Sequence, residues 1–450
     1  MTTIALVAVC SGYIIAPMGM ASVNVAIPNL ASDLNASAQL VGWLPTLYLL
    51  SSVAFMLPCG KLADNYGRKR VYVAGLILHV IAAAMSALAH SIESVLVWRF
   101  IQGAAGAMIF GTGVAIITSV VPVHRRGTAL GIVASCVYLG LTIAPAIGGW
   151  LTEIWGWRSV FFFQVPLVVV LLVFIKISFK GDWKNQTHPD FDWLGTLQFA
   201  AFSAFLVIGL SRLPSLLGLA CVIASIVALG LFILHQSRHS QPLIRVQLFR
   251  ENRLFSLSLT TSFFMYGSNF ALIFLMSLYL QYVRGFGPAA AGQILLLQAL
   301  AMALVAPFAG KLADRFQPRI IATLGCVIVA VGFALLNHID NATTTVFISA
   351  SLLSVGVGFG LFSTPNNTAI MGAVDSQEVG VASASMNLSR TIGNLVGMSI
   401  VNLMVQHNIG DVALSAKQNS AIMETVSLAF AVSLFFVLIA CIISALRGRR

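Results

Sequence analysis

Fourteen apolar runs, each long enough to cross a lipid bilayer, divide this chain from end to end. A transmembrane helix needs about 20 mostly apolar residues. Because lipid offers no partner to a free backbone amide, only helices and closed barrels can span a membrane. A barrel would show short segments of alternating hydrophobicity, which the sequence lacks. It therefore predicts an all-α polytopic membrane protein with helices near 3–28, 39–60, 71–90, 94–120, 128–153, 157–178, 193–211, 214–236, 254–282, 288–310, 320–338, 343–367, 380–405 and 424–446.

Composition and charge support this class. Only 9% of the 450 residues are charged and 58% are hydrophobic, whereas soluble domains carry about 25% charged residues. The net charge of +11 comes from short basic clusters between apolar runs, so we interpret it as a topology signal and expect no nucleic-acid partner. Most Lys and Arg lie in alternate loops, and such loops face the cytoplasm. We therefore expect both termini to be cytoplasmic, in a multi-pass protein of the inner or plasma membrane.

A repeated pentapeptide indicates two related halves. GKLAD occurs at Gly60–Asp64 and again at Gly310–Asp314, each time at the end of an even-numbered run. If the seventh and eighth runs are an insertion, the two copies occupy equivalent places in two six-helix repeats. The sequence then predicts a 6+2+6 arrangement. Its parts are an N-terminal bundle at 1–180, two inserted helices with flanking cytoplasmic loops at 181–253, and a C-terminal bundle at 254–450.

The first copy continues as GKLADNYGRKR. This stretch resembles the loop signature of the major facilitator superfamily, G-x-L-A-D-x-x-G-R-K/R. The resemblance implies the major facilitator fold and a conformational latch made by Gly60, Asp64, Gly67 and Arg68, with Asp314 in the second copy. The second copy reads RFQPR and lacks the following Gly-Arg-Lys.

Two arginines are expected inside spans. Arg99 and Gln102 lie three residues apart in WRFIQGAAG and so share a helix face, in a stretch that resembles the superfamily's R-x-x-Q-G-x-G motif. An arginine in a span is costly unless it faces a cavity or a partner. Alternatively, Arg99 extends to the nearby outer interface. Arg390 lies in SASMNLSRTIG, which resembles an N-x-x-R-x-x-G segment of the group named below.

The fifth and sixth spans narrow the resemblance. GLTIAPAIGG, with Gly140, Pro145, Gly148 and Gly149, resembles the antiporter signature G-x-x-x-G-P-x-x-G-G, with Ala144 in place of a glycine. An ordinary packing face of small residues is the alternative. GWRSVFFFQVP resembles the entry to the sixth helix of the fourteen-spanner drug:proton antiporters, with Gln164 in place of the usual asparagine. Asp192–Gly195 resembles the D-x-x-G start of their inserted helix.

One departure concerns proton coupling. The resembled group ends its first helix with L-D-x-T-I-V-N-V-A-L-P, whereas this chain reads MGMASVNVAIP and has Gly19 at the acid position. No Asp or Glu replaces it deep in a span. We expect coupling, if present, to rest on Arg99, Gln102, Glu153, His79 or Arg390. A lone histidine on an apolar helix is more often a packed core residue.

Polar and aromatic residues near mid-depth of the spans are candidates for a substrate cavity, although each could equally be a packing residue. These are Asn24, Tyr48, Tyr138, Tyr266, Asn269, Gln298 and Asn366. The sequence has no P-loop and no HExxH or GxSxG motif. We expect neither an enzyme nor a cofactor, and no metal.

The resemblance implies a secondary active transporter that exports small amphipathic or drug-like compounds by alternating access, in exchange for protons. Its partners would be the small-molecule substrate, protons and the bilayer, and we expect a monomer. Because Gly19 replaces the acid, a uniporter or an importer of a specific metabolite is an alternative. A non-transporting membrane scaffold is an alternative of another class, against which the repeated loops argue.

Overall fold

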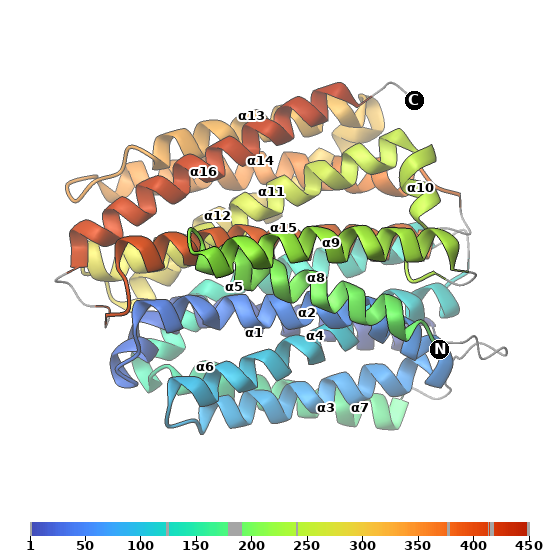
Figure 1. The fold of residues 1–450 in the computed structure, drawn as a ribbon, viewed down its shortest axis with the longest axis horizontal. Coiled ribbons are helices and arrows are strands. Elements are labelled where there is room, and N and C mark those ends of the chain that lie inside the picture. The colour runs from blue at the N-terminus through green and yellow to red at the C-terminus, as the bar shows by residue number, and fades with distance from the viewer. Residues whose placement is uncertain are drawn as a thin grey trace. The chain divides into compact units, whose positions relative to one another are not determined.

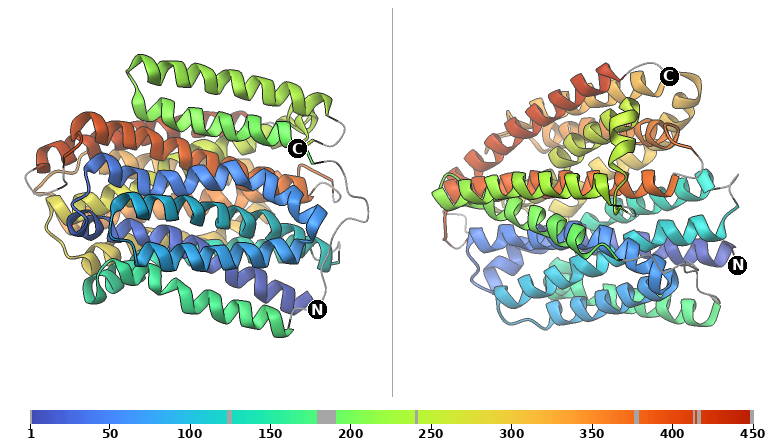
Figure 2. Two further views of the ribbon diagram at one scale, coloured as in Figure 1. Left: turned by 60° about the horizontal axis from the view of Figure 1, so that its bottom comes forward. Right: turned by 45° about the vertical axis from the view of Figure 1, so that its right-hand side comes forward.

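The computed structural model describes residues 2–122, 126–178, 191–239, 242–375, 379–412, 414 and 418–447. Fourteen helices of the described part are long and apolar enough to cross a membrane, and each overlaps one of the predicted spans. The described residues form no β-strand. The predicted all-helical fold and the number of spans are therefore confirmed (Figures 1 and 2).

The helices follow one another with short connections. Those before the predicted insertion are α1 (Thr2–Asp33), α2 (Ala38–Tyr66), α3 (Arg68–Ala87), α4 (Ile92–Val120), α5 (Arg126–Trp155), α6 (Arg158–Phe162) and α7 (Gln164–Ser178). The inserted pair is α8 (Trp193–Arg212) and α9 (Leu216–Arg238). The remainder are α10 (Val246–Glu251), α11 (Arg253–Leu278) with a π-helical end at Tyr279–Val283, α12 (Pro288–Arg315), α13 (Pro318–Leu336), α14 (Thr345–Met371), α15 (Val379–Asn408) and α16 (Asn419–Leu446).

Polar side chains directly before several helices fix where these begin. The hydroxyl of Ser91 accepts a hydrogen bond from the Ser94 backbone N–H at 3.3 Å, and the amide oxygen of Asn252 accepts one from Phe255 at 2.9 Å. A cap of this kind satisfies one of the free N–H groups at a helix start, where lipid or protein could not. The sequence therefore sets helix starts locally, while the length of each apolar run sets the span.

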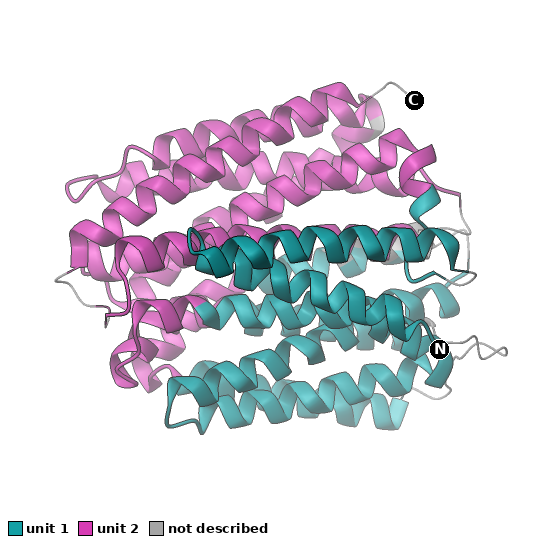
Figure 3. Cartoon of the chain, in the orientation of Figure 1, with its two compact units in different colours: residues 1–20, 43–141, 158–247 teal, residues 21–42, 142–157, 248–450 magenta. Residues whose placement is uncertain are grey.

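The chain divides into two compact units, shown in Figure 3. Unit 1 comprises residues 1–20, 43–141 and 158–247, and it contains the inserted pair α8 and α9, which pack on each other. Unit 2 comprises residues 21–42, 142–157 and 248–450. The division into bundles at 1–180 and 254–450 stays a prediction.

Small residues bring helices together within each unit. In unit 1, a Cβ atom on Gly103 of α4 would overlap the carbonyl oxygen of Tyr48 on α2. In unit 2, α11 packs on α15 and α16, and a Cβ atom on Gly397 of α15 would overlap the carbonyl oxygen of Gly267 on α11. Close backbone approach of this kind is what small residues allow between membrane helices, where no hydrophobic force drives association.

Candidate functional site

A buried polar network lies inside unit 1, on four different helices. Arg99 and Gln102 of α4 are fully buried, and His79 of α3 and Gln164 of α7 are each 1% exposed. The Arg99 Nη1 group donates to Oε1 of Gln102 at 2.7 Å, and Gln102 Nε2 donates to Oε1 of Gln164 at 3.0 Å. The same Gln164 oxygen lies 3.0 Å from Nε2 of His79. The network thus joins a permanent cation to a histidine through two neutral amides.

The Arg99 guanidinium lies over the ring of Tyr48 on α2, with its central carbon 4.7 Å from the ring centroid. A cation over an aromatic face is stabilised by the ring quadrupole, more strongly when water is excluded. Because Arg99 is 0% exposed, its head group is enclosed within the protein and does not extend to the outer interface. The expected shared face of Arg99 and Gln102 is confirmed by their hydrogen bond.

Several polar atoms of this network have no hydrogen-bond partner among the described residues. They are Nε and Nη2 of Arg99, the Tyr48 hydroxyl and Nδ1 of His79. A buried donor or acceptor without a partner costs about 1–3 kcal/mol, so native proteins keep few of them. These atoms offer donors and a titratable acceptor, beside an aromatic face, to a molecule that enters the site.

Gly19 and Gln164 fit each other. A Cβ atom on Gly19 of α1 would overlap the side-chain oxygen of Gln164 and lie 2.6 Å from its Cδ. The amide is held there by its own bond to the Val160 carbonyl at 2.8 Å, as well as by the network. The two departures from the resembled pattern therefore occupy one volume, and a neutral amide fills the place beside the residue where that pattern has an acid.

Sequence reasoning treated these two departures separately, and it did not select Gln164 as a site residue. Gln164 and Gln102 are 62 positions apart. A single sequence has no signal that would bring them together. Gln102, His79 and Tyr48, by contrast, were all candidates, and the structure places all three around Arg99.

The second buried arginine, Arg390 of α15, lies in unit 2. Its guanidinium is over the ring of Tyr266 on α11, 4.9 Å from the centroid, and it donates a hydrogen bond to Asn367 Oδ1. Elsewhere in unit 2, Nε2 of Gln298 donates to Oδ1 of Asn269 at 2.6 Å. Four predicted site residues thus form two separate pairs.

Asn366, another cavity candidate, is engaged by the end of the chain. The Arg447 guanidinium, which directly follows α16 and is 1% exposed, donates to Asn366 Oδ1 and to the Ser258 hydroxyl. Asn366 Nδ2 donates to Ser262 Oγ at 2.8 Å. Burial lowers the pKa of Arg447 to about 10, so the group stays charged near neutral pH. Sequence reasoning counted Arg447 only as a topology charge and missed this role.

The remaining cavity candidates have different surroundings. Asn24 is 1% exposed, and its side-chain oxygen and nitrogen have no hydrogen-bond partner among the described residues. Tyr138 is buried in α5 of unit 1. No distance joins either residue to the pairs above, so both stay predictions.

The predicted latch loop is a compact joint of unit 1. Asp64 Oδ1 accepts from Nε of Arg68 at 2.9 Å, and Nη1 of Arg68 donates to the Ala115 carbonyl of α4 at 2.9 Å. Gly67 has φ of 114°, in a region that favours glycine. Gly60 faces Gly111 of α4, where an added Cβ would make an ordinary contact of 3.8 Å. The side chain of Asp314 lies outside the part that the structure describes.

We expect Asp64→Asn to lower transport about fivefold, the factor that corresponds to roughly 1 kcal/mol. The asparagine keeps an oxygen for Arg68 but loses the charge that fixes its guanidinium against α4. Asp314→Asn should have a smaller effect, because the second copy has no Gly-Arg-Lys. The measurement is initial transport rate normalised to protein in the membrane. Equal and negligible effects of the two changes would exclude a latch role.

The antiporter-like stretch of α5 consists of close backbone contacts. A Cβ atom on Gly148 would lie 2.5 Å from the Ser22 carbonyl oxygen, and one on Gly149 would lie 3.0 Å from the Pro288 carbonyl carbon. The Pro145 carbonyl carbon is 3.1 Å from the position of a Cβ on Gly292. These three contacts belong to unit 2. Gly140 makes the equivalent approach within unit 1, 3.1 Å from the Ile14 carbonyl carbon.

The predicted external ends of α1 and α5 are bonded within unit 2. Exposed Glu153 accepts a hydrogen bond from the Ala289 N–H at 2.8 Å, at the start of α12. Gln281 donates to the Val25 carbonyl at 2.9 Å and Tyr282 to the Pro28 carbonyl at 3.2 Å. A cavity of about 520 Å³ opens beside these bonds, lined by Pro28, Asn29, Ser32, Asp33, Gln281, Tyr282, Phe286, Pro288 and Leu414.

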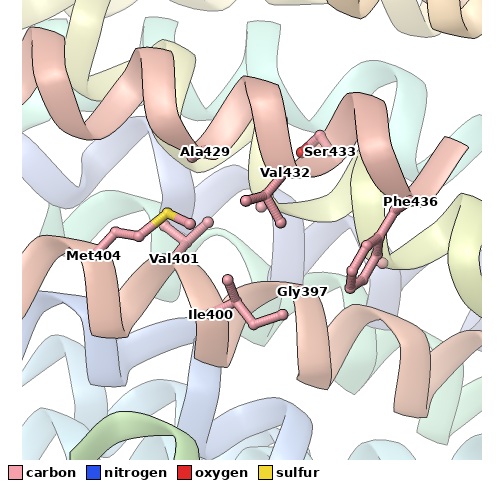
Figure 4. A pocket seen from close by; sticks show the side chains of 10 residues that line it. Gly397, Ile400, Val401, Met404, Ala429, Val432, Ser433 and Phe436 are labelled. Carbon is pink, nitrogen blue, oxygen red and sulfur yellow. The ribbon is translucent and has the colours of Figure 1, made fainter. Parts of the chain in front are cut away.

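A second hollow in unit 2 lies between α11, α15 and α16 (Figure 4). Its walls include Gly397, Val401, Met404, Ala429 and Phe436. The volume of about 10 Å³ suits at most one water molecule. This hollow is a packing gap and not a substrate site.

Comparisons with known proteins agree with this architecture. A sequence profile described as "Major Facilitator Superfamily" matches residues 9–398. The chain is 28% identical to "Riboflavin transporter RibZ" of Clostridioides difficile, over 88% of this chain and 86% of that one. It is 28% identical to "Multidrug resistance protein Stp" of Mycobacterium tuberculosis CDC 1551, over 84% and 71%, and 27% identical to "Multidrug transporter protein MdtP" of Bacillus subtilis, over 86% and 72%.

Among solved structures, the chain resembles a bacterial homologue of the human lysosomal transporter Spinster in an inward-facing, unoccupied conformation. The TM-score is 0.67, with 99% of this chain and 96% of that one covered. At 18% sequence identity this likeness concerns the fold alone.

Proposed function

This chain belongs to the major facilitator superfamily, and from that premise we propose that it exports small amphipathic or drug-like compounds in exchange for protons. As a member, it is a multi-pass transporter of small molecules in the plasma membrane and not an enzyme. The direction of transport, the substrate class and the proton are the proposed parts. Relatives named as multidrug transporters support the substrate class.

The observation that carries the proposal is the Arg99 network. Its free donors and the Tyr48 ring offer both a polar and an aromatic surface, as an amphipathic molecule requires. His79 is its titratable member besides Tyr48 and Arg99, and it meets Arg99 through Gln102 and Gln164. A nearby cation disfavours a protonated histidine. A substrate that draws the Arg99 charge away would therefore change the proton affinity of His79.

Alternating access would supply the movement. The bonds of Glu153 to Ala289, Gln281 to Val25 and Tyr282 to Pro28 would keep the external end closed in the present state. Opening that end requires all three to break, while the Asp64 joint and its counterpart at Asp314 would hold the cytoplasmic end. Glu153 is a second proton candidate, because protonation would weaken its bond to the α12 start.

The test uses purified protein in liposomes with ethidium as the amphipathic probe. We expect an imposed pH gradient to accelerate ethidium movement, and ethidium to provoke proton release from the protein. His79→Ala or Glu153→Gln should remove the release if that residue carries the proton. Ethidium movement that ignores the gradient would exclude proton antiport, and full proton release in both variants would exclude both carriers.

A second candidate function is transport of one metabolite without proton coupling. It is favoured by Gly19, which leaves α1 without an acid, and by the relative named as a riboflavin transporter. In the same liposomes, riboflavin movement without ethidium movement, unaffected by the pH gradient, would select this function over drug export.

A further inference from the structure

We propose that Asp192, His235 and His239 form a binding site for a divalent transition metal, with Zn²⁺ the best match. The three residues lie at the adjoining ends of the inserted helices α8 and α9, within unit 1. Their ligand atoms all lie within 4.8 Å of one another. Two imidazoles and a carboxylate are a common ligand set for Zn²⁺, with water in the fourth position.

The geometry requires little movement. His235 and His239 are four residues apart at the end of α9, so they share one face, and their ring centroids are 5.1 Å apart. Nε2 of His235 already lies 2.8 Å from Oδ1 of Asp192. With bonds of about 2.0–2.1 Å, the ligand atoms of a tetrahedral Zn²⁺ site are roughly 3.3 Å apart. His239 is only half-buried and can turn toward the other two.

Outer partners hold the carboxylate in place. Oδ1 of Asp192 accepts from the Gly195 N–H at 2.8 Å, and Oδ2 accepts from Nε2 of Gln236 at 2.6 Å. Gln236 is itself fixed, because its side-chain oxygen accepts from the Leu243 N–H at 2.6 Å. Hydrogen-bonded carboxylates of this kind are typical of metal sites, where the outer partners orient the ligand.

Asp192 also has the right charge. Burial opposes its ionisation, but the hydrogen bonds from Gly195, Gln236 and His235 outweigh burial and hold the pKa of Asp192 below its usual value. The group is therefore a carboxylate at neutral pH, when the histidines are largely neutral and able to bind a metal. Capping of α8 accounts for the bond to Gly195 alone, and a helix cap does not require a histidine pair.

A metal here would close the inserted hairpin at one end, because one ligand comes from α8 and two come from the end of α9. None of the three residues belongs to the Arg99 network. We therefore expect the metal to stabilise the inserted pair, and the site does not depend on the proposed substrate or on proton coupling.

The experiment uses the full-length protein in detergent, with its affinity tag removed and bound metal stripped by EDTA. Calorimetric titration with ZnCl₂ should give one site per chain, and thermal unfolding should shift to higher temperature with Zn²⁺. Co²⁺ should give the visible absorption of a tetrahedral site. We expect His239→Ala and Asp192→Asn each to weaken Zn²⁺ binding about tenfold or more, at least the scale of an outer-partner loss.

His338→Ala is the matched control, since His338 is an exposed histidine after α13 and lies outside the cluster. It should leave Zn²⁺ binding unchanged. Asparagine at 192 can still cap α8, and His239 makes no cap, so both variants should fold. Absence of Zn²⁺ binding by the unaltered protein, or equal binding by His239→Ala, would overturn the proposal.

Discussion

Replacing Arg99 with alanine should lower transport by about 10- to 100-fold while the protein still reaches the membrane. The guanidinium is fully buried, bonded to Gln102 and placed over Tyr48. A hydrogen bond to a charged group contributes about 1.5–3 kcal/mol, and each 1.4 kcal/mol is a factor of ten in affinity. Alanine removes both this bond and the only permanent charge of the network.

Arg99→Lys separates the charge from the shape of the group. Lysine keeps the cation but cannot reproduce the planar fork that meets both an amide and a ring face. We expect an intermediate rate. Arg212→Ala serves as the control, because Arg212 is an exposed arginine at the end of α8. Transport rates are measured per amount of folded protein, judged by size-exclusion profile. An Arg99→Ala protein that transports as fast as Arg212→Ala would show that the network has no part in transport.

A glycine in unit 2 should carry the largest effect on stability. A Cβ atom on Gly397 would overlap the Gly267 carbonyl oxygen and lie 2.8 Å from its carbonyl carbon. Both obstacles are backbone, so no side chain can turn away, and α15 must separate from α11. Overpacking costs about 1–3 kcal/mol even in cores that can adjust. We expect Gly397→Ala to lower the unfolding temperature clearly and Gly397→Val to prevent assembly.

Gly230→Ala is the comparison, because a Cβ atom at Gly230 in α9 has nothing within 4 Å. Alanine in an open helix position should be neutral or stabilising, since glycine is the poorer helix former by about 1 kcal/mol. The measurement is thermal unfolding of the purified proteins in one detergent. Equal unfolding temperatures for Gly397→Ala and Gly230→Ala would mean that α11 and α15 are less closely packed than described.

The spans could be predicted because the bilayer imposes a length on each helix separately. Even the interrupted sixth span, split into α6 and α7 at Phe163, read as one apolar run. The contact of Arg99 with Gln102 was also predictable, because it follows from a spacing of three on one helix. Arg447 was not, since it stands beside Arg449 and Arg450 and looks like part of a basic tail. Its burial depends on what packs around the end of α16, which no local pattern records.

Gly19 and Gln164 restrict each other's evolution. An aspartate at position 19 would displace the Gln164 amide, and that amide is bonded to Gln102, His79 and the Val160 carbonyl. The acid therefore cannot return by one substitution without breaking the network that surrounds Arg99. A smaller residue at 164 must come first, and that intermediate loses the amide bonds while gaining no acid. The neutral pair acts as a ratchet, so that descendants of this chain inherit an acid-free first helix.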